Sequence, residues 1–478
     1  MMLWNSPEEM MSALRGIATV EGDTLTILDE TRFHHEAIDK LVWNAAFAED
    51  GLVRDTARWI IWEGALRMGC PSASIHDFYM ARVRDGWKDM TVPAINLRGL
   101  TYDTARQIFK ALKRINAKAC IFEIAKSEMQ YTAQSPAEFT SCVLAAAIRE
   151  GYKGPVFVQG DHFQANAKNF KADAQKEIAG LKELIREAVG AGFYNIDIDT
   201  STLVDLDKPT TMEQQRANFE SAAELTKYIR SVEPKGVTVS VGGEIGEVGG
   251  QNSNADELSA YVEGYNGVLN AGGKKLVGLS KISVQTGTSH GGVPMADGSV
   301  AKVKLDFDVL STLGDMCRTQ FGIGGVVQHG ASTLPESAFD NFPKRQTLEV
   351  HLATGFQNTL FDSSSFPKNM REQMYAWIDK NCANEKKPDQ TPDQFYYKAR
   401  KKAYGPFKKP LWMLPDNTKS ALMSELHRQF DMLFSKLDIK DSASYIDAFV
   451  KPALVHHPRP TQAKSGVKIE VDDNSNAD

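Results

Sequence analysis

The strongest constraint on the fold is an alternation of apolar, strand-like runs with helical patterns between residues 92 and 354. The runs are 92–97, 119–124, 155–160, 194–199, 237–243, 280–285, 324–328 and 348–353. Most segments between them repeat apolar residues at steps of three and four, which places one helix face against a sheet. Eight such units predict an α/β fold, a parallel (β/α)8 TIM barrel. The alternative is an open, doubly wound sheet, although no GxGxxG fingerprint follows the first run.

Two segments flank the repeated region. Residues 1–90 contain a long helical pattern and are expected to form a helical N-terminal extension in front of a barrel of residues 91–362. Residues 363–478 contain a polar linker, an amphipathic helical pattern and a loose acidic tail. We therefore expect one barrel with helical extensions at both ends.

Composition limits the classes of function. A net charge of -6 and only short basic runs argue against binding to nucleic acid, which needs a concentrated basic surface. The sequence has neither a long apolar span nor a signal-peptide pattern, so we expect no membrane segment. Its five cysteines are scattered without a CxxC motif, as expected for reduced thiols in a cytoplasmic protein.

Polar residues follow the apolar runs where barrel strands would end. Active sites of TIM barrels lie at this end of the strands, so these residues are the first candidates for chemistry. They are Asp161 and His162 after the third run, Asp199 at the end of the fourth, Glu244 and Glu247 after the fifth, His290 after the sixth and His329 after the seventh.

Three of the ten histidines, His162, His290 and His329, therefore fall on one rim, each from a different strand. Three imidazole ligands and one open coordination position form a catalytic zinc arrangement. The alternative is that each histidine makes only a local hydrogen bond. Gly291 and Gly330 place backbone N–H groups beside the predicted metal, where barrels commonly bind phosphate.

Five segments resemble the class II fructose-bisphosphate aldolase family in order and spacing. They read VFVQGDH, AGFYNIDIDTS, EIGEVGG, TSHGGVPMADGSVAKVKL and VQHGAS. The resemblance covers about residues 92–362 and extends weakly to FYYKARKKAY. GDHFQANAKNF and IDTS are also similar to the accessory subunit of tagatose-bisphosphate aldolase, whose chains lack the later histidines.

The resemblance implies a metal site with two positions. His162, His290 and His329 would bind a catalytic Zn2+ ion. Asp199 and Glu244 would line a second position, for a divalent or a monovalent cation.

The resemblance also implies how a phosphorylated sugar is held and cleaved. Asp161 would be the acid/base for the C4 hydroxyl of the substrate. The implied phosphate-binding residues are Gly291, Gly330, Ser332, Thr354 and Arg400. Arg400 would reach the substrate of a neighbouring subunit, so a homodimer or higher homo-oligomer is expected.

The chain departs from the family pattern at two places. Gln251 and Asn252 stand where the family has a glutamate that moves a proton at C3, and Glu247, on the same glycine-flanked loop, is the nearest replacement. On the eighth strand, His351 and Ala353 stand where the family has asparagine and aspartate.

These observations favour a zinc-dependent aldolase that cleaves fructose 1,6-bisphosphate into dihydroxyacetone phosphate and glyceraldehyde 3-phosphate. Two alternatives stay open within the resemblance: a non-catalytic accessory subunit, and an aldolase for tagatose bisphosphate or another ketose phosphate. A different metal-dependent barrel enzyme, such as a hydrolase, is the third alternative.

Overall fold

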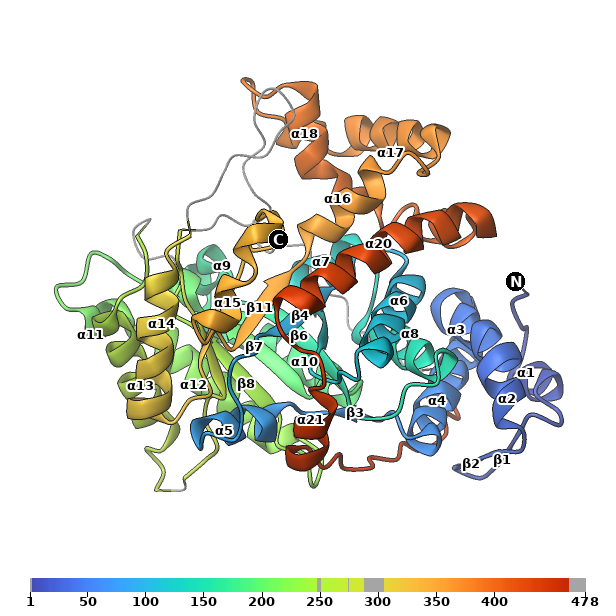
Figure 1. The fold of residues 1–478 in the computed structure, drawn as a ribbon, viewed down its shortest axis with the longest axis horizontal. Coiled ribbons are helices and arrows are strands. Elements are labelled where there is room, and N and C mark those ends of the chain that lie inside the picture. Colours follow the sequence, from blue (N-terminus) through green and yellow to red (C-terminus); the bar gives the residue numbers. More distant parts are fainter. Residues whose placement is uncertain (1, 247–250, 274, 288–304, 464–478) are drawn as a thin grey trace.

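A closed ring of eight parallel strands forms the centre of the molecule (Figure 1). The computed structural model describes residues 2–246, 251–273, 275–287 and 305–463. The ring strands are β4 (Val92–Asn96), β5 (Ile121–Ala125), β6 (Val156–Gln164), β7 (Asn195–Asp199), β8 (Ser240–Glu244), β9 (Lys281–Ser283), β10 (Val326–Gln328) and β11 (Glu349–Leu352). Pairing of β11 with β4 and of β6 with β7 closes the ring, so the predicted TIM barrel is confirmed and the open sheet is wrong.

Helices between the strands cover the outside of the barrel. They are α6 (Thr101–Arg114), α7 (Lys126–Tyr131), α8 (Pro136–Arg149), α9 (Ala167–Ala172), α10 (Ala174–Gly190), α11 (Thr211–Gln214), α12 (Arg216–Val232), α13 (Ala255–Leu269), α14 (Phe307–Met316), α15 (Asn341–Lys344) and α16 (Thr354–Asp362). Asp173 caps the N-terminus of α10 by accepting from the Lys176 N–H, and residues at three- and four-residue steps, among them Ile178 and Leu181, are buried.

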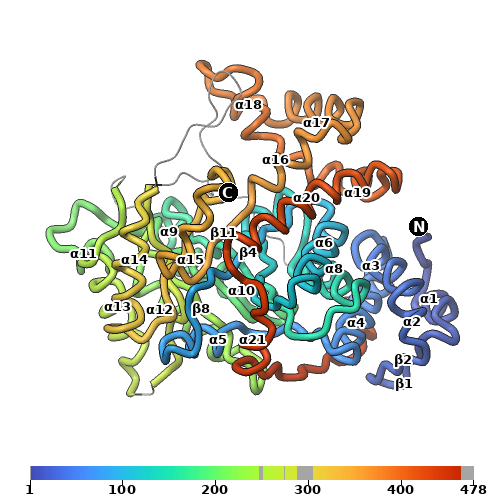
Figure 2. The backbone as a smooth tube through the Cα atoms, viewed as in Figure 1, coloured from blue at the N-terminus to red at the C-terminus, as the bar shows by residue number. Residues whose placement is uncertain are grey.

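The first part of the chain forms an extension at one end of the molecule (Figure 2). It contains α1 (Pro7–Ala13), the hairpin β1 (Ala18–Glu21) and β2 (Thr24–Ile27), α2 (Glu30–Arg32), α3 (Ile38–Phe47) and α4 (Gly51–Met68). The next two elements return to the barrel: β3 (Ser72–Ala73) pairs with β6, and α5 (His76–Val83) packs against α21 (Ala443–Phe449). The hairpin was not expected, although its turn at Gly22-Asp23 and its alternating β-branched residues are typical hairpin signals. Because α3 and α4 pack on the outer side of α8, that helix is buried on nearly every face.

The C-terminal part adds five further helices among the described residues. They are α17 (Lys368–Asn381), α18 (Pro392–Ala399), α19 (Lys408–Trp412), α20 (Asp416–Lys436) and α21 (Ala443–Phe449). Helix α20 packs against α6 and α16, whereas α17 and α18 project away from the barrel (Figures 1 and 2). The predicted acidic tail lies mostly in 464–478, outside the described residues.

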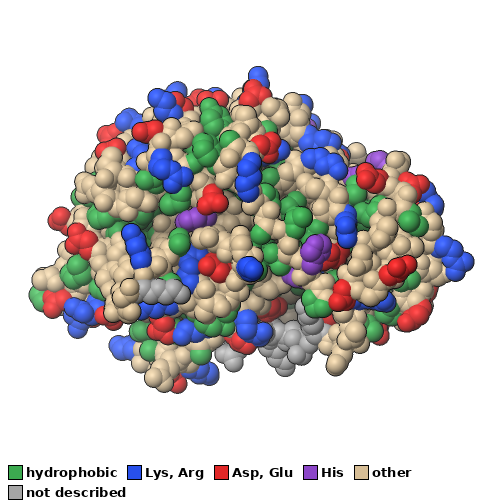
Figure 3. Space-filling model, turned by 90° about the horizontal axis from the view of Figure 1, so that it is seen from below, with side chains coloured by type: hydrophobic (Ala, Val, Ile, Leu, Met, Phe, Trp, Pro, Cys, Tyr) green, Lys and Arg blue, Asp and Glu red, His purple; other side chains and the backbone are tan. Residues whose placement is uncertain are grey.

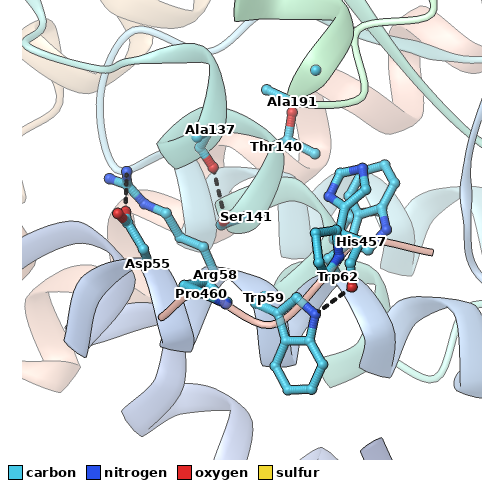
Figure 4. A pocket seen from close by; sticks show the side chains of 13 residues that line it. Asp55, Arg58, Trp59, Trp62, Ala137, Thr140, Ser141, Ala191, His457 and Pro460 are labelled. Carbon is cyan, nitrogen blue, oxygen red and sulfur yellow. Dashed lines mark hydrogen bonds and ion pairs between the residues drawn. The ribbon is translucent and has the colours of Figure 1, made fainter. Parts of the chain in front are cut away.

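After α21 the chain returns to the N-terminal extension and crosses α4 (Figure 4). The ring of His457 stacks on Trp62 with centroids 4.3 Å apart, and Trp59 Nε1 donates to the His457 carbonyl at 2.8 Å. The Glu63 carboxylate accepts from the His457 backbone N–H at 3.0 Å. These contacts join the segment around His457 to helix α4 of the N-terminal extension.

Two observations describe the charge of one face and the apolar character of the helices. Basic and acidic side chains are interspersed on the face that Figure 3 shows. None of the helices in the described part of the chain combines the length and the apolar character that a membrane crossing requires. The five cysteines, all within that part, are buried and form no disulfide with one another.

A layer of charged side chains fills the barrel interior below the ends of the strands. Lys281 Nζ lies 2.5 Å from Glu349 Oε1 and 2.9 Å from Asp197 Oδ2, and it donates to Gln159 Oε1 at 2.7 Å. Gly242 on β8 makes room for this layer, because a Cβ there would lie 2.2 Å from Asp197 Oδ1 and 2.9 Å from Lys281 Cε. Burying charges requires pairing of this kind, since an unpaired charge in the interior is very costly.

We predict that Gly242→Ala destabilises the fold, because the new methyl group must push apart the Lys281–Asp197 pair. Overpacking of a barrel interior costs roughly 1–3 kcal/mol, which a lowered melting temperature should report. Gly180→Ala is the matched control, since Gly180 lies within α10 and its added Cβ would have nothing within 4 Å. The control should be neutral or slightly stabilising; equal melting temperatures for the two variants would contradict the prediction.

Candidate metal and catalytic site

A β-bulge in β6 lets two consecutive side chains reach the barrel interior. Side chains of a regular strand alternate between its two faces, so Asp161 and His162 would normally point in opposite directions. Gly160 and Phe163 of β6 pair with Ile196 and Ile198 of β7, which leaves one extra residue on β6. His162 takes a positive φ of 40°, a strained conformation for a residue with a side chain.

The bulge brings Asp161 and His162 together with His329. Each of the three can offer a ligand atom, and these atoms lie within 4.8 Å of one another. All three side chains are buried, and the rings of His162 and His329 have centroids 4.3 Å apart. Two imidazoles side by side are donors that suit zinc, and the Asp161 carboxylate lies beside them. The residues present therefore fit the predicted metal.

The second predicted cation position also comes together around His162. Its Nδ1 lies 3.1 Å from Asp199 Oδ2 and 3.4 Å from Glu244 Oε2, and these three residues form a further group that can hold a metal. Burial opposes a charge on His162, yet Asp161 and Glu244 hold the pKa of His162 well above its ordinary value. The surplus of carboxylates thus favours positive charge at this point, whether on the imidazole or on a bound cation.

Three of the predicted site residues lie outside the described residues: Glu247, His290 and Gly291. Asn252, at the position of the family glutamate, donates to Asp306 Oδ2 at 3.4 Å.

The other predicted phosphate ligands at the rim lie near the ends of β10 and β11. Gly330 follows β10 with a positive φ of 64°, and Thr354 is the first residue of α16. Ser332 lies against the start of α16, since a Cβ on Gly355 would come within 2.4 Å of the Ser332 carbonyl oxygen. The Thr354 hydroxyl accepts from Arg98 Nη1 at 3.1 Å. A helix N-terminus at the barrel rim is a suitable place for an anion.

Arg400 lies among the C-terminal helices. Its guanidinium pairs with Asp362 at 2.6 Å and donates to Asn358 Oδ1 at 2.6 Å, and it stacks near the rings of Phe361 and Tyr397. To bind a phosphate of the substrate in a neighbouring subunit, the Arg400 guanidinium would have to contact that phosphate in addition to Asp362 or in place of it.

The sequence did not indicate the residues that surround Asp161. Asn96 Nδ2 donates to Asp161 Oδ2 at 2.9 Å, and His351 Nδ1 lies 3.1 Å from Asp161 Oδ1. Burial opposes ionisation of Asp161, but His162 and His351 hold its pKa well below the ordinary value. Asp161 is therefore held as an ionised carboxylate. One sequence signal could have pointed to these partners: charged residues stand within otherwise apolar strand runs, at Glu123, Lys281 and Glu349.

Comparison with solved structures gave matches of low sequence identity, the first of which supports the fold. A fructuronate-tagaturonate epimerase from Cohnella laeviribosi matches with a TM-score of 0.50 and 12% identity, over 74% of this chain and 83% of that chain. A fructose-bisphosphate aldolase from Campylobacter jejuni matches with a TM-score of 0.46 and 16% identity, over 78% and 97% of the two chains. A probable tagatose 6 phosphate kinase from Sinorhizobium meliloti 1021 matches with a TM-score of 0.49 and 16% identity, over 75% and 97%.

Comparison with curated protein sequences gave no significant match. The family model described as fructose-bisphosphate aldolase class-II matches residues 87–408, which is more than half of the chain and includes the barrel with its bulged strand. With its rim carboxylates and histidines in the order of that family, the chain belongs to the class II fructose-bisphosphate aldolase family.

Proposed function

We propose that the chain is a zinc-dependent aldolase that reversibly cleaves fructose 1,6-bisphosphate into dihydroxyacetone phosphate and glyceraldehyde 3-phosphate. The observation that carries the proposal is the bulge of β6, which presents Asp161 and His162 side by side next to His329. A base beside metal ligands is the arrangement that a retro-aldol reaction needs.

Each of the site residues has a separate role in the proposed reaction. His162, His290 and His329 would hold a zinc ion, which would supply Lewis-acid stabilisation of the negative charge that develops on the ketose oxygens. Asp161 accepts the proton of the C4 hydroxyl as the C3–C4 bond breaks, so that C4 leaves as an aldehyde. The bond's electron pair stays on the three-carbon fragment as an enediolate, and a proton then returns to C3. Glu247 is our proposed donor for that step.

The substrate phosphates are assigned to the rim. Gly291, Gly330, Ser332 and Thr354 are proposed to bind one phosphate by backbone N–H and hydroxyl groups, close to the N-terminus of α16. Arg400 is proposed to bind the other phosphate, in the site of a neighbouring subunit of a homo-oligomer.

A second candidate function is that of a non-catalytic accessory subunit, because Gln251 and Asn252 replace the family glutamate. Neither amide can accept a proton near neutral pH. Measurements of bound zinc and of cleavage separate the two functions. The aldolase proposal expects about one zinc per active site and turnover of fructose 1,6-bisphosphate that a chelator abolishes. Bound zinc without cleavage of fructose or tagatose 1,6-bisphosphate would instead favour the accessory function.

We predict that metal binding and proton transfer can be separated by two asparagine variants. His162→Asn should lose both zinc and activity, and asparagine is chosen because it tolerates the positive φ of residue 162. Asp161→Asn should keep its zinc yet lower kcat by about 10²–10⁴-fold, the contribution of a positioned acid/base. Zinc can be measured by atomic emission and kcat by a coupled assay.

The control for these variants is His76→Asn, since His76 is buried in α5 and belongs to neither metal group. It should keep wild-type zinc content and turnover per folded molecule. Near wild-type turnover of Asp161→Asn would show that Asp161 is not the base.

We also predict that Arg400→Ala raises KM for the bisphosphate much more than KM for a monophosphate ketose, because a planar guanidinium matches phosphate. Lys401→Ala is the control, since an ammonium group on the neighbouring residue should matter less. If KM rises equally for both substrates and the melting temperature falls, the role of Arg400 is only structural, through its ion pair with Asp362.

A further inference from the structure

We propose that His351 is a positioning residue that holds the Asp161 carboxylate in the orientation needed for proton transfer. The inference rests on the proposed function, in which Asp161 is the base. His351 lies on β11, which β5 and β4 separate from the bulged strand β6 in the ring, and is almost fully buried.

The two ring nitrogens of His351 face different partners. On one side Nδ1 lies 3.1 Å from Asp161 Oδ1 and 3.3 Å from Glu123 Oε1. On the other side Nε2 lies 2.6 Å from Glu349 Oε1 and 3.5 Å from Asp197 Oδ2. Carboxylates on both edges of the imidazole fix the plane of the ring, so its Nδ1 side can point only toward Asp161 and Glu123.

Glu349 is itself held in place. Its Oε1 accepts from Lys281 Nζ at 2.5 Å and from Gln159 Nε2 at 3.2 Å, and its Oε2 accepts from the Tyr79 hydroxyl. The orientation of His351 therefore depends on the buried charged layer, and its ring also packs against that of His329, with centroids 4.1 Å apart. Groups locked by such outer contacts position reacting side chains more accurately than unsupported ones.

His351 completes a clamp on Asp161. Its Nδ1 faces Oδ1, while Asn96 Nδ2 donates to Oδ2 at 2.9 Å. Asn96 also donates to Glu128 Oε2 at 2.9 Å, and Glu128 pairs with Arg98 at 2.6 Å. With one partner on each oxygen, Asp161 cannot rotate about its side-chain bonds without losing a buried contact. These contacts fix the orientation of the Asp161 side chain, which the strained backbone of the neighbouring residue 162 fixes less firmly on its own.

The geometry allows the two sides of the imidazole to be tested separately. The amide of asparagine can place an N–H group near the Nδ1 position, and the longer glutamine can place one near the Nε2 position. His351→Asn, which introduces the residue that the family pattern has here, should keep the contact with Asp161. His351→Gln should keep the contact with Glu349 and lose the one with Asp161.

The proposal predicts a split between the two variants in steady-state kinetics. His351→Gln should lower kcat about 10²-fold, as expected when a reacting group is misplaced by about 1 Å, while KM and zinc content stay near wild type. His351→Asn should retain kcat within a few-fold of wild type. His76→Gln is the control for loss of a buried histidine, and it should change the melting temperature without lowering kcat.

Crystal structures of the two variants provide a readout that does not need turnover. Asp161 should keep its orientation in His351→Asn and turn away from residue 351 in His351→Gln. Equal losses of kcat in both variants, or an unmoved Asp161 in His351→Gln, would overturn the proposal. Loss of a bound metal ion from either variant would also overturn it, because Glu123, Asp161 and His351 would then be ligands of a metal. Absence of cleavage by the wild-type chain would reject the proposed function without deciding the position of Asp161.

Discussion

The extra residue in β6 is the constraint on which the site depends. Without it, Asp161 and His162 could not both face the barrel interior, because neighbours on a regular strand point to opposite faces. The positive φ of His162 costs on the order of 1–3 kcal/mol, so the surrounding structure must hold the bulge in place. Phe163 packs over Gly160, where a Cβ would come within 2.4 Å of the ring, and Asp199 and Glu244 contact His162.

The charge balance of the barrel interior links this bulge to the rest of the ring. Glu123, Asp197 and Glu349 lie beneath the site, and Lys281 is the buried ammonium group that pairs with the last two. Burial raises the pKa of Asp197 to about 6 even though Lys281 opposes the shift. The interior therefore holds more carboxylate than nearby cationic side chains can neutralise, which favours a cation at the rim and a positively charged contact on Asp161.

The sequence predicted the barrel because apolar runs and helical patterns alternate with regular spacing, and each of the eight runs overlaps a strand. It predicted that Asp161, His162, His329, Asp199 and Glu244 would lie together, because the ends of parallel strands share one rim. Spacing alone could not show the bulge, since the sequence GDH does not tell a regular strand from a strand with one extra residue. It also could not show the partners of Asp161, because Asn96 lies on the first strand of the ring and His351 lies on the last. The hairpin before α2 was missed because helical patterns dominate the first 90 residues.

The bulge of β6 is proposed to build a zinc site with a base beside it. Anomalous diffraction at the zinc edge, from crystals of the purified chain, shows whether a zinc ion binds there. We expect a peak about 2.0–2.1 Å from ring nitrogens of His162 and His329, with the Asp161 carboxylate nearby but clamped by Asn96 and His351. A zinc peak elsewhere in the molecule, or no peak in crystals grown with zinc, would contradict the account.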